Sequence, residues 1–303
     1  MLALSSHPLA VRIAQRLPSS IRQVYRICAA DEVTSTNTLL KEAASDAIRA
    51  GEDICPTVLL ARRQSGGRGR LGRSFHSPDG TGLYMSVLLT PDLPPADAAR
   101  LTTAAAVAAA DAVDAVREAY AHQNHGHCGI KWVNDLYLGD KKCCGILAEA
   151  ALTPTADAFA YAVIGIGINL LPPTNGFPED IADSACALFD QSDKIDTDDL
   201  LARLCAGILC RLTEALAPEN KNDVLSAYRR RSILDGRAIT VRPASSLGGE
   251  EIPATAFGID DDFGLIVRYE DGCVAHLSSG EVVLCGDGGA SAVQSARASV
   301  HLS

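Results

Sequence analysis

Apolar and polar positions alternate along the chain in patterns that predict helices and strands in mixed order. After Ser35-Thr36-Asn37, residue types preferred as helix caps, apolar residues recur at helical spacing until Gly51. Further helices are predicted at 97–120, 198–216 and 222–233. Strands are predicted at 57–61, 83–89 and 162–170. Gly165 and Gly167 interrupt the last strand, which indicates a bulge or a ligand close to the backbone.

Residues 130–149 are predicted to form a strand, a turn, a short strand and a Gly-Asp hairpin that leads into a longer strand. This arrangement can bring Lys131 and Lys142 to one site from neighbouring strands, although lysines near a hairpin are usually only solvated. The Ser35-Thr36-Asn37 motif leaves a similar choice. These residues suffice as helix caps, and they can also meet the polar edge of a small neutral ligand.

The two ends of the chain differ from its middle. Residues 1–30 contain four arginines and no acidic residue, as organellar transit peptides do. Because no cleavage signal is evident, we favour an N-terminal extension or a helix packed on the domain. Between 237 and 285, apolar and polar residues alternate between glycine-rich turns, which predicts a small all-β unit. The Gly, Ala and Ser content beyond Gly286 predicts a disordered tail.

The composition is that of a globular protein with a sizeable core. The 303 residues are 47% hydrophobic, enough for one large domain or two, and no apolar run is long enough to cross a bilayer. The net charge of −10 argues against a general nucleic-acid binder. Ten cysteines without a Cys-x-x-Cys pair indicate reduced thiols in the cytoplasm. The stretch from His122 to Cys128 could bind a metal, but we interpret it as a polar loop.

The stretch from Gln64 to Phe75 reads Gln-Ser-Gly-Gly-Arg-Gly-Arg-Leu-Gly-Arg-Ser-Phe and carries the most distinctive chemistry. Its glycines permit positive φ and close approach to a ligand, and its arginines can form paired hydrogen bonds to phosphate. We therefore predict an anion-binding loop that its ligand orders. The glycine spacing also matches the dinucleotide fingerprint, which requires a following helix and a later acidic residue. Because a turn and a strand follow here, we reject that interpretation.

Four motifs in this order resemble those of biotin protein ligases. They are Ser35-Thr36-Asn37, then Gln64 to Arg73, then Lys131-Trp132-Val133-Asn134-Asp135 with Lys142-x-x-Gly145-Ile146-Leu147, then Gly165-Ile166-Gly167-Ile168-Asn169. The resemblance implies an α+β fold, with a catalytic domain at 31–233 built on a mixed β-sheet with surrounding helices. A small SH3-like β-barrel would follow at 234–286, with an N-terminal extension at 1–30 and a tail at 287–303.

The same resemblance implies that biotin reacts with ATP to give biotinyl-5′-adenylate and pyrophosphate, and then passes to a lysine of a biotin carboxyl carrier domain. Mg²⁺ is expected with ATP, without a metal site of the protein's own. The expected protein is a cytoplasmic monomer or homodimer that binds neither nucleic acid nor membrane. Because the biotin carboxylate must meet a phosphate, fixed cations are needed. The candidate catalytic cations are Arg68, Arg70, Lys131 and Lys142.

The resemblance also assigns binding residues. Those for biotin are Ser35, Thr36, Asn37, Gln64, Gly67, Arg68, Gly69, Arg70, Lys142, Gly145 and Gly165. Those for the nucleotide are Arg68, Arg73, Phe75, Lys131, Asn134, Asp135 and Asn169, with Phe75 stacked on adenine.

Three positions depart from the usual family pattern. Val133 stands in place of a proline, Leu71 in place of an arginine of some relatives, and Cys143-Cys144 in place of an aliphatic pair. Two alternatives remain. A lipoate or octanoate ligase of the same superfamily is disfavoured by the Gly-Arg loop followed by Lys-Trp-x-Asn-Asp. A non-catalytic biotin-binding module, such as a repressor, is disfavoured by the acidic charge and by the lack of a DNA-binding segment before Ser35.

Overall fold

The computed structural model describes residues 5–120, 126–190, 195–242 and 251–284. The chain divides into two compact units, Met1–Arg231 and Ser232–Ser303. None of the helices in the described ranges combines the length and apolar character that a membrane crossing requires. The predicted tail at 287–303 and the histidine-rich residues 122–125 lie outside the described residues, so the interpretations of these segments stay predictions.

The first unit is built on a seven-stranded sheet in the order β1-β2-β3-β7-β6-β5-β4. The strands are β1 (Arg26–Val33), β2 (Thr57–Gln64), β3 (Gly82–Leu89), β4 (Gly129–Lys131), β5 (Asp135–Leu138), β6 (Lys141–Leu152) and β7 (Phe159–Asn169). Strands β1 and β2 pair in parallel, and the other neighbours pair antiparallel. The prediction of an α+β fold with a mixed sheet is confirmed.

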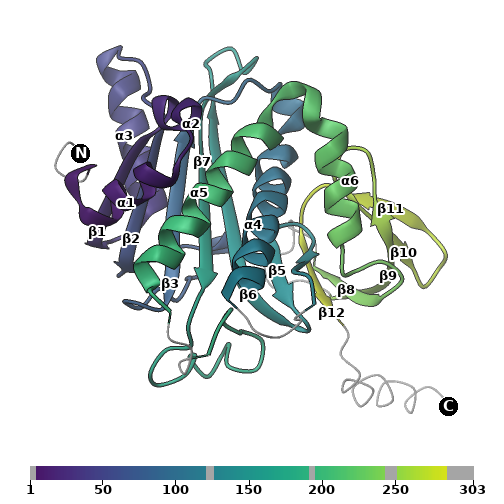
Figure 1. Cartoon of the computed structure of the whole chain (residues 1–303). Helices are drawn as coiled ribbons and strands as arrows, with labels where there is room; N and C mark the ends of the chain where they lie inside the picture. The colour runs from purple at the N-terminus through teal and green to yellow at the C-terminus, as the bar shows by residue number, and fades with distance from the viewer. Residues whose placement is uncertain (1–4, 121–125, 191–194, 243–250, 285–303) are drawn as a thin grey trace, which may run out of the picture. The chain divides into compact units, whose positions relative to one another are not determined.

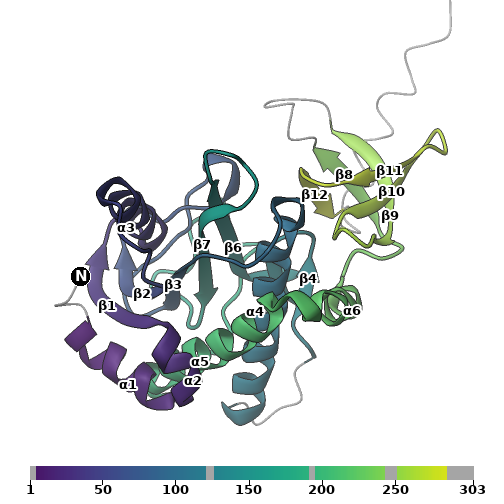
Figure 2. The same cartoon turned by 90° about the horizontal axis from the view of Figure 1, so that it is seen from above.

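Helices lie on both sides of this sheet, with α3 on one side and α1, α4 and α5 on the other (Figure 2). The helices are α1 (Pro8–Arg16), α2 (Ser19–Val24), α3 (Thr36–Ala50), α4 (Ala99–Tyr120), α5 (Thr197–Leu216) and α6 (Lys221–Arg231). Short 3₁₀ turns are η2 (Arg70–Gly72), η3 (Pro95–Asp97) and η4 (Pro218–Asn220). Figure 1 shows α4 and α5 side by side along the sheet. The alanine-rich α4 is buried along most of its length, because small side chains let it pack closely between β6, β7 and α5.

The N-terminal segment is part of the first unit. Leu9, Ala10 and Ile13 of α1 are buried, and α1 packs against α5 and β1. Strand β1 begins at Arg26, before the boundary at residue 31 that the motifs indicated. The reason is the apolar run from Ile27 to Ala30, which is buried and pairs with β2.

The second unit contains an antiparallel five-stranded sheet in the order β11-β10-β9-β8-β12. Its strands are β8 (Ala238–Arg242), β9 (Ile252–Ile259), β10 (Leu265–Tyr269), β11 (Val274–Leu277) and β12 (Glu281–Leu284). Apolar residues of β8, β9 and β10 that alternate along the strands are buried, including Ile239, Val241, Ala256, Leu265 and Val267. This arrangement is consistent with the small SH3-like unit that the sequence predicts.

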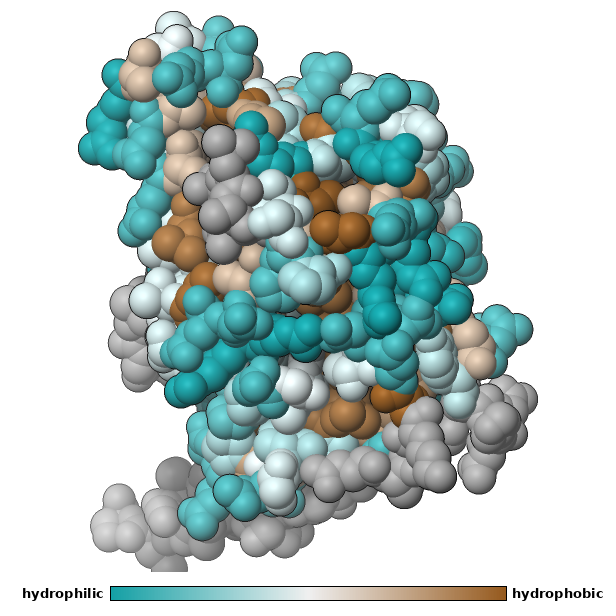
Figure 3. All heavy atoms as spheres, turned by 60° about the vertical axis from the view of Figure 1, so that its left-hand side comes forward, coloured by the Kyte–Doolittle hydropathy of each residue, from teal (hydrophilic) through white to brown (hydrophobic). Residues whose placement is uncertain are grey.

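Within the described ranges, the large hydrophobic residues that are exposed belong to different helices, strands and loops. They are Val11, Val24, Ile48, Leu71, Leu152, Phe257 and Val274. On the face shown in Figure 3, hydrophilic side chains predominate and hydrophobic ones form small separate patches. Scattered hydrophobic residues of this kind are normal on a globular protein.

Candidate active site

The first turn of α3 supplies the polar floor of a pocket against the sheet. Ser35 caps the helix, because its Oγ accepts a hydrogen bond from the Thr38 N–H at 3.4 Å. Gly51 ends the helix in the left-handed conformation, with φ of 69°. Thr36 and Asn37 are buried, so their side chains face the sheet instead of solvent. The remaining walls come from β2, β3, β6, β7, the turn between β4 and β5, and the stretch from Gln64 to Phe75, which we call the glycine-arginine loop.

A chain of hydrogen bonds joins these floor residues to two strands. The Oε1 of Gln64, at the end of β2, accepts from the backbone N–H of Thr36 at 2.9 Å. The Thr36 Oγ1 lies 2.7 Å from the Oγ of Ser86 on β3, and Ser86 donates to the Oδ1 of Asn37 at 2.6 Å. Because this network combines hydroxyl and amide groups, it can recognise a small neutral polar ring.

The glycine-arginine loop folds as a narrow turn after β2. The Gly69 N–H donates to the Arg73 carbonyl at 2.7 Å, and the Phe75 N–H donates to the Gly67 carbonyl at 3.0 Å. A Cβ at Gly67 would lie 2.4 Å from the Phe75 carbonyl oxygen, so only glycine fits there. Of the loop glycines only Gly72 has positive φ, at 75°, and Leu71 has φ of 55°. Positive φ is therefore found at one of the loop glycines, Gly72, whereas Gly67 is needed for the space it leaves beside the Phe75 carbonyl.

Two cations are held at the pocket by the turn between β4 and β5. Arg70 Nη1 donates to Asn134 Oδ1 at 2.9 Å, and Asn134 Nδ2 donates to Asp135 Oδ1 at 3.0 Å. The Nζ of Lys142 lies 2.7 Å from the same Asp135 oxygen. Arg68, Arg70 and Lys142 all line the pocket, so a carboxylate or phosphate bound there has three cationic partners.

Glycines of β6 and β7 make room for two side chains of the pocket. A Cβ at Gly165 would lie 2.2 Å from Asn37 Oδ1, and a Cβ at Gly167 would lie 2.5 Å from the Phe75 ring. Phe75 also lies close to Gly145, where the corresponding distance is 3.3 Å. The close approach that the glycine-broken strand predicts is thus made, in the structure, by Asn37 and Phe75.

Four residues assigned to the nucleotide do not line this pocket. Lys131 lies with its Nζ 5.7 Å from the centre of the Tyr137 ring, and Asn169 donates from Nδ2 to the Cys186 carbonyl at 3.0 Å. Asp135 contacts Lys142 but does not itself line the pocket. Arg73 is an exposed loop residue. Lys131 and Lys142 come from strands that β5 separates, so the expectation of neighbouring strands is wrong. Only Lys142 of the two lines the pocket.

The structure adds Ser86 and Glu149, which the sequence analysis missed. Ser86 is the single polar residue of the strand 83–89 apart from Tyr84, a signal that could have identified it. Glu149 on β6 accepts hydrogen bonds from Asn37 Nδ2 at 3.0 Å and Lys41 Nζ at 2.6 Å. Burial raises the pKa of Glu149, but the hydrogen bonds from Lys41 and Asn37 and the charge of Arg68 outweigh it, and the pKa is lowered. No local pattern indicates Glu149, because its partners come from distant segments.

Tyr228 of α6 is a further residue that the sequence analysis missed. It is fully buried, and its hydroxyl donates to the Val133 carbonyl at 3.1 Å. Burial raises the pKa of Tyr228, so its hydroxyl keeps its proton and remains a donor. The hydrogen bond supports the turn that carries Asn134 and Asp135, in which the Trp132–Val133 peptide bond is cis.

The pocket thus combines a polar floor with three cations suited to carboxylate and phosphate. Residues 29–169 match the model of the Biotin/lipoate A/B protein ligase family. The "Bifunctional ligase/repressor BirA" of Bacillus spizizenii is 33% identical over 247 residues, which cover 80% of this chain and 69% of that protein. The "Biotin--[acetyl-CoA-carboxylase] ligase" of Mycobacterium tuberculosis is 31% identical over 253 residues, which cover 82% and 85%.

A solved structure agrees with these relatives. The biotin protein ligase from Aquifex aeolicus in complex with biotin and ATP has a TM-score of 0.64 at 27% identity, covering 85% of this chain and 97% of that one. The chain belongs to the biotin protein ligases of the biotin/lipoate protein ligase family. Its activity is the ATP-dependent ligation of biotin.

Proposed function

We propose that this pocket carries out both steps of biotin ligation. In the first step, a carboxylate oxygen of biotin attacks the α-phosphorus of ATP, biotinyl-5′-adenylate forms and pyrophosphate leaves. In the second, a lysine amine attacks the acyl carbon, an amide forms, AMP leaves and the amine loses a proton. The observation that carries the proposal is that Arg68, Arg70 and Lys142 line the same pocket as Thr36, Asn37 and Gln64.

The biotin rings are proposed to lie on the floor formed by Ser35, Thr36, Asn37 and Gln64. The biotin carboxylate would then meet Lys142, whose charge is fixed before the reaction and stabilises the negative charge that accumulates on the phosphate. The remaining proposed biotin contacts are Gly67, Arg68, Gly69, Arg70, Gly145 and Gly165, which provide backbone access, space and charge.

ATP is proposed to bind on the side of the pocket where Asn134 and Asp135 lie, with Phe75 against the adenine. Parts of ATP would extend past the pocket. There they would contact Arg73, Lys131 and Asn169. Mg²⁺ enters with ATP and neutralises part of its triphosphate. Among the described residues, no group of three or more His, Cys, Asp or Glu side chains could hold a metal ion.

The acceptor is proposed to be a biotin carboxyl carrier domain of a carboxylase. Biotin protein ligases act on such carrier proteins, and the Mycobacterium tuberculosis relative is named for acetyl-CoA carboxylase. The net charge of −10 argues against a nucleic-acid partner. The free cysteines of the described residues support a reducing compartment such as the cytoplasm.

Exchange of labelled pyrophosphate into ATP tests the first step, measured with biotin, lipoate or octanoate as the acid. We expect exchange with biotin and little with the other two acids. A carrier domain added with biotin and ATP should then become labelled on one lysine. Exchange that depends on lipoate or octanoate and not on biotin would contradict the proposal.

A further inference from the structure

Glu149 connects three parts of the site without lining the pocket itself. Its carboxylate accepts from Asn37 Nδ2 at 3.0 Å and from Lys41 Nζ at 2.6 Å, both on α3. Arg68 of the glycine-arginine loop lies 3.8 Å from the same carboxylate. The Glu149 side chain is only 20% exposed, so these contacts replace most of its hydration.

The carboxylate determines which way the Asn37 amide points. An ionised carboxylate only accepts hydrogen bonds, so the NH₂ group of Asn37 must face Glu149 and its oxygen must face away. The Leu147 carbonyl, 3.3 Å from Asn37 Nδ2, adds a second acceptor on the same side. A reversed amide would place Asn37 Oδ1 against two oxygen acceptors and is therefore disfavoured.

The direction of Asn37 sets the order of donors along the floor. Ser86 donates its single proton to Asn37 Oδ1 at 2.6 Å. The single Thr36 hydroxyl proton has two acceptors in reach, Ser86 Oγ at 2.7 Å and Gln64 Oε1 at 3.1 Å. Because Ser86 has already donated its own proton, the shorter contact is a hydrogen bond only when Thr36 donates to Ser86. The Gln64 Oε1 accepts a hydrogen bond from the Thr36 backbone N–H. Its second lone pair can then accept a hydrogen bond from an N–H group of the ligand. A cyclic urea has such N–H groups, whereas the dithiolane ring of lipoate has none.

We propose that Glu149 is a positioning residue for ligand selection: it orients Asn37, and through Ser86 and Thr36 it leaves the floor with acceptors for a ring that carries N–H groups. This inference rests on the proposed function, because the ring in question is the urea of biotin. Glu149 acts through Asn37 and does not touch the ligand.

The test is Glu149→Gln, which keeps the shape of the side chain and removes the charge that holds the Asn37 amide. We expect the KM for biotin in pyrophosphate exchange to rise about tenfold, the scale of one hydrogen bond to a charged group. The kcat at saturating biotin and the KM for ATP should change less than about twofold, because the cations of the reaction remain. Discrimination between biotin and lipoate should fall by the same factor as the biotin affinity.

Two further variants separate positioning from a general structural effect. Lys41→Met removes an ion-pair partner of Glu149 and keeps the hydrogen bond between Asn37 and Glu149, and it should change the KM for biotin less than about twofold. Asn37→Asp combined with Glu149→Gln exchanges the amide and the carboxylate while position 37 still presents an oxygen to Ser86. This double variant should bind biotin better than Asn37→Asp alone.

A folded Glu149→Gln protein with an unchanged KM for biotin would overturn the inference. If that variant does not fold, the comparison of Asn37→Asp with the double variant decides, and a double variant no better than the single one would equally refute the role. Wild-type protein without biotin-dependent exchange would instead refute the proposed function, so the two failures are distinguishable.

Discussion

Arg70 and Asn134 meet across two distant segments, with Arg70 Nη1 donating to Asn134 Oδ1 at 2.9 Å. Asn134 also donates from Nδ2 to the carbonyl of Ile146 on β6 at 3.0 Å, so its amide is held firmly in place. The glycine-arginine loop is therefore fastened to the strand hairpin that carries Lys142. A loop fastened in this way can cover an intermediate that must not escape.

Arg70→Gly should yield an enzyme that forms the adenylate but releases it. Loss of this charged contact should weaken retention on the order of tenfold, because one hydrogen bond to a charged group is removed. Released acyl-adenylate reacts with any amine it meets, so lysines of a protein without a carrier domain should become biotinylated. Arg63→Ala, which removes an exposed arginine paired with Glu32, is the matched control. Adenylate synthesis without stray labelling would show that Arg70 does not retain the intermediate.

Lys142→Ala should impair adenylate formation far more than folding. Its Nζ contacts Asp135, and the side chain is 34% exposed, so little packing is lost. The barrier should rise by roughly 2.7–4 kcal/mol, the scale for removing a preorganised charge-stabilising group, which lowers biotin-dependent exchange about 10²–10³-fold. Lys141→Ala, at the neighbouring exposed position, should exchange normally. A folded Lys142→Ala protein with normal exchange would remove Lys142 from the reaction.

Biotin should protect the glycine-arginine loop from trypsin. The loop carries three arginines close together, and an anion bound at the pocket beside Arg68 and Arg70 offsets part of their mutual repulsion. Cleavage after Arg68, Arg70 or Arg73 should slow markedly with biotin and ATP, and should not slow with a non-hydrolysable ATP analogue alone. The rate is measured from the fragments of limited digestion by mass spectrometry. Equal rates with and without biotin would mean that the loop does not close on the ligand.

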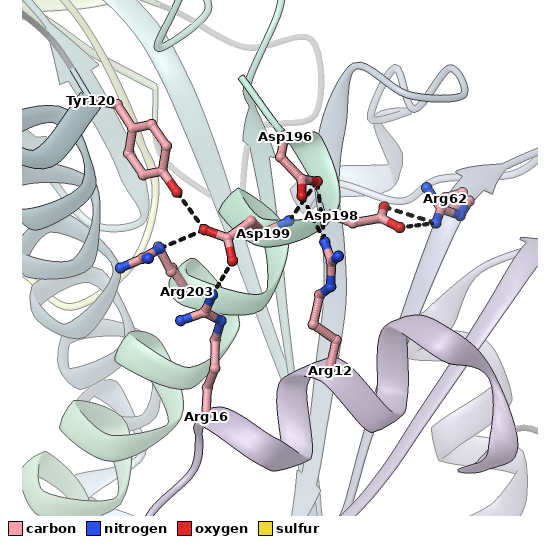
Figure 4. A network of polar contacts seen from close by, with 8 residues as sticks. All are labelled: Arg12, Arg16, Arg62, Tyr120, Asp196, Asp198, Asp199 and Arg203. Atoms are coloured by element: carbon pink, nitrogen blue, oxygen red, sulfur yellow. Dashed lines mark hydrogen bonds and ion pairs between the residues drawn. The ribbon is translucent and has the colours of Figure 1, made fainter. Parts of the chain in front are cut away.

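A network of charges ties α1 to the start of α5 (Figure 4). Arg12 pairs with Asp196 at 3.1 Å, and Arg16 pairs with Asp199. Asp199 also accepts from Arg203 Nε at 2.7 Å and from the Tyr120 hydroxyl at 2.6 Å. Two arginines of the segment that resembles a transit peptide thus form ion pairs with α5 and its N-cap residue. These ion pairs help to hold the segment in the first unit.

Asp199 should make stability depend on pH in the acid range. Hydrogen bonds from Arg203 and Tyr120, with the charge of Arg16, lower the pKa of Asp199 from 3.8 to about 2. Because the folded pKa is lowered, the stabilisation is complete above the unfolded value of 3.8 and is lost as the pH falls from there toward about 2.

Asp199→Asn should therefore lower the melting temperature at pH 7, and the difference from wild type should shrink as the pH falls through this window. Melting is followed by circular dichroism, with Asp53→Asn, an exposed position outside the network, as the control. A difference between wild type and Asp199→Asn that is the same at pH 3 and pH 7 would contradict the proposed linkage.

The sequence by itself determined most of the helices and strands and the class of chemistry, although it did not predict α2 and β1. Ser35 and Gly51 delimit α3 because cap preferences depend only on nearby residues. Turn formation also depends on nearby residues. For this reason the sequence predicted the hairpin between β5 and β6 and the glycine-arginine loop. The four motifs then indicated biotin ligation, which the relatives confirm.

Only the tertiary structure decided which side chains share the pocket. Strand β5 lies between β4 and β6, so Lys142 lines the pocket and Lys131 lies over Tyr137. Glu149 contacts Lys41 across 108 positions of sequence, because α3 packs on the sheet to which β6 belongs. Hydrophobic periodicity shows which face of an element is buried, but it does not specify which strands become neighbours. The contact of Glu149 with Asn37 depends on the order of the strands in the sheet. Local sequence patterns therefore could not predict it.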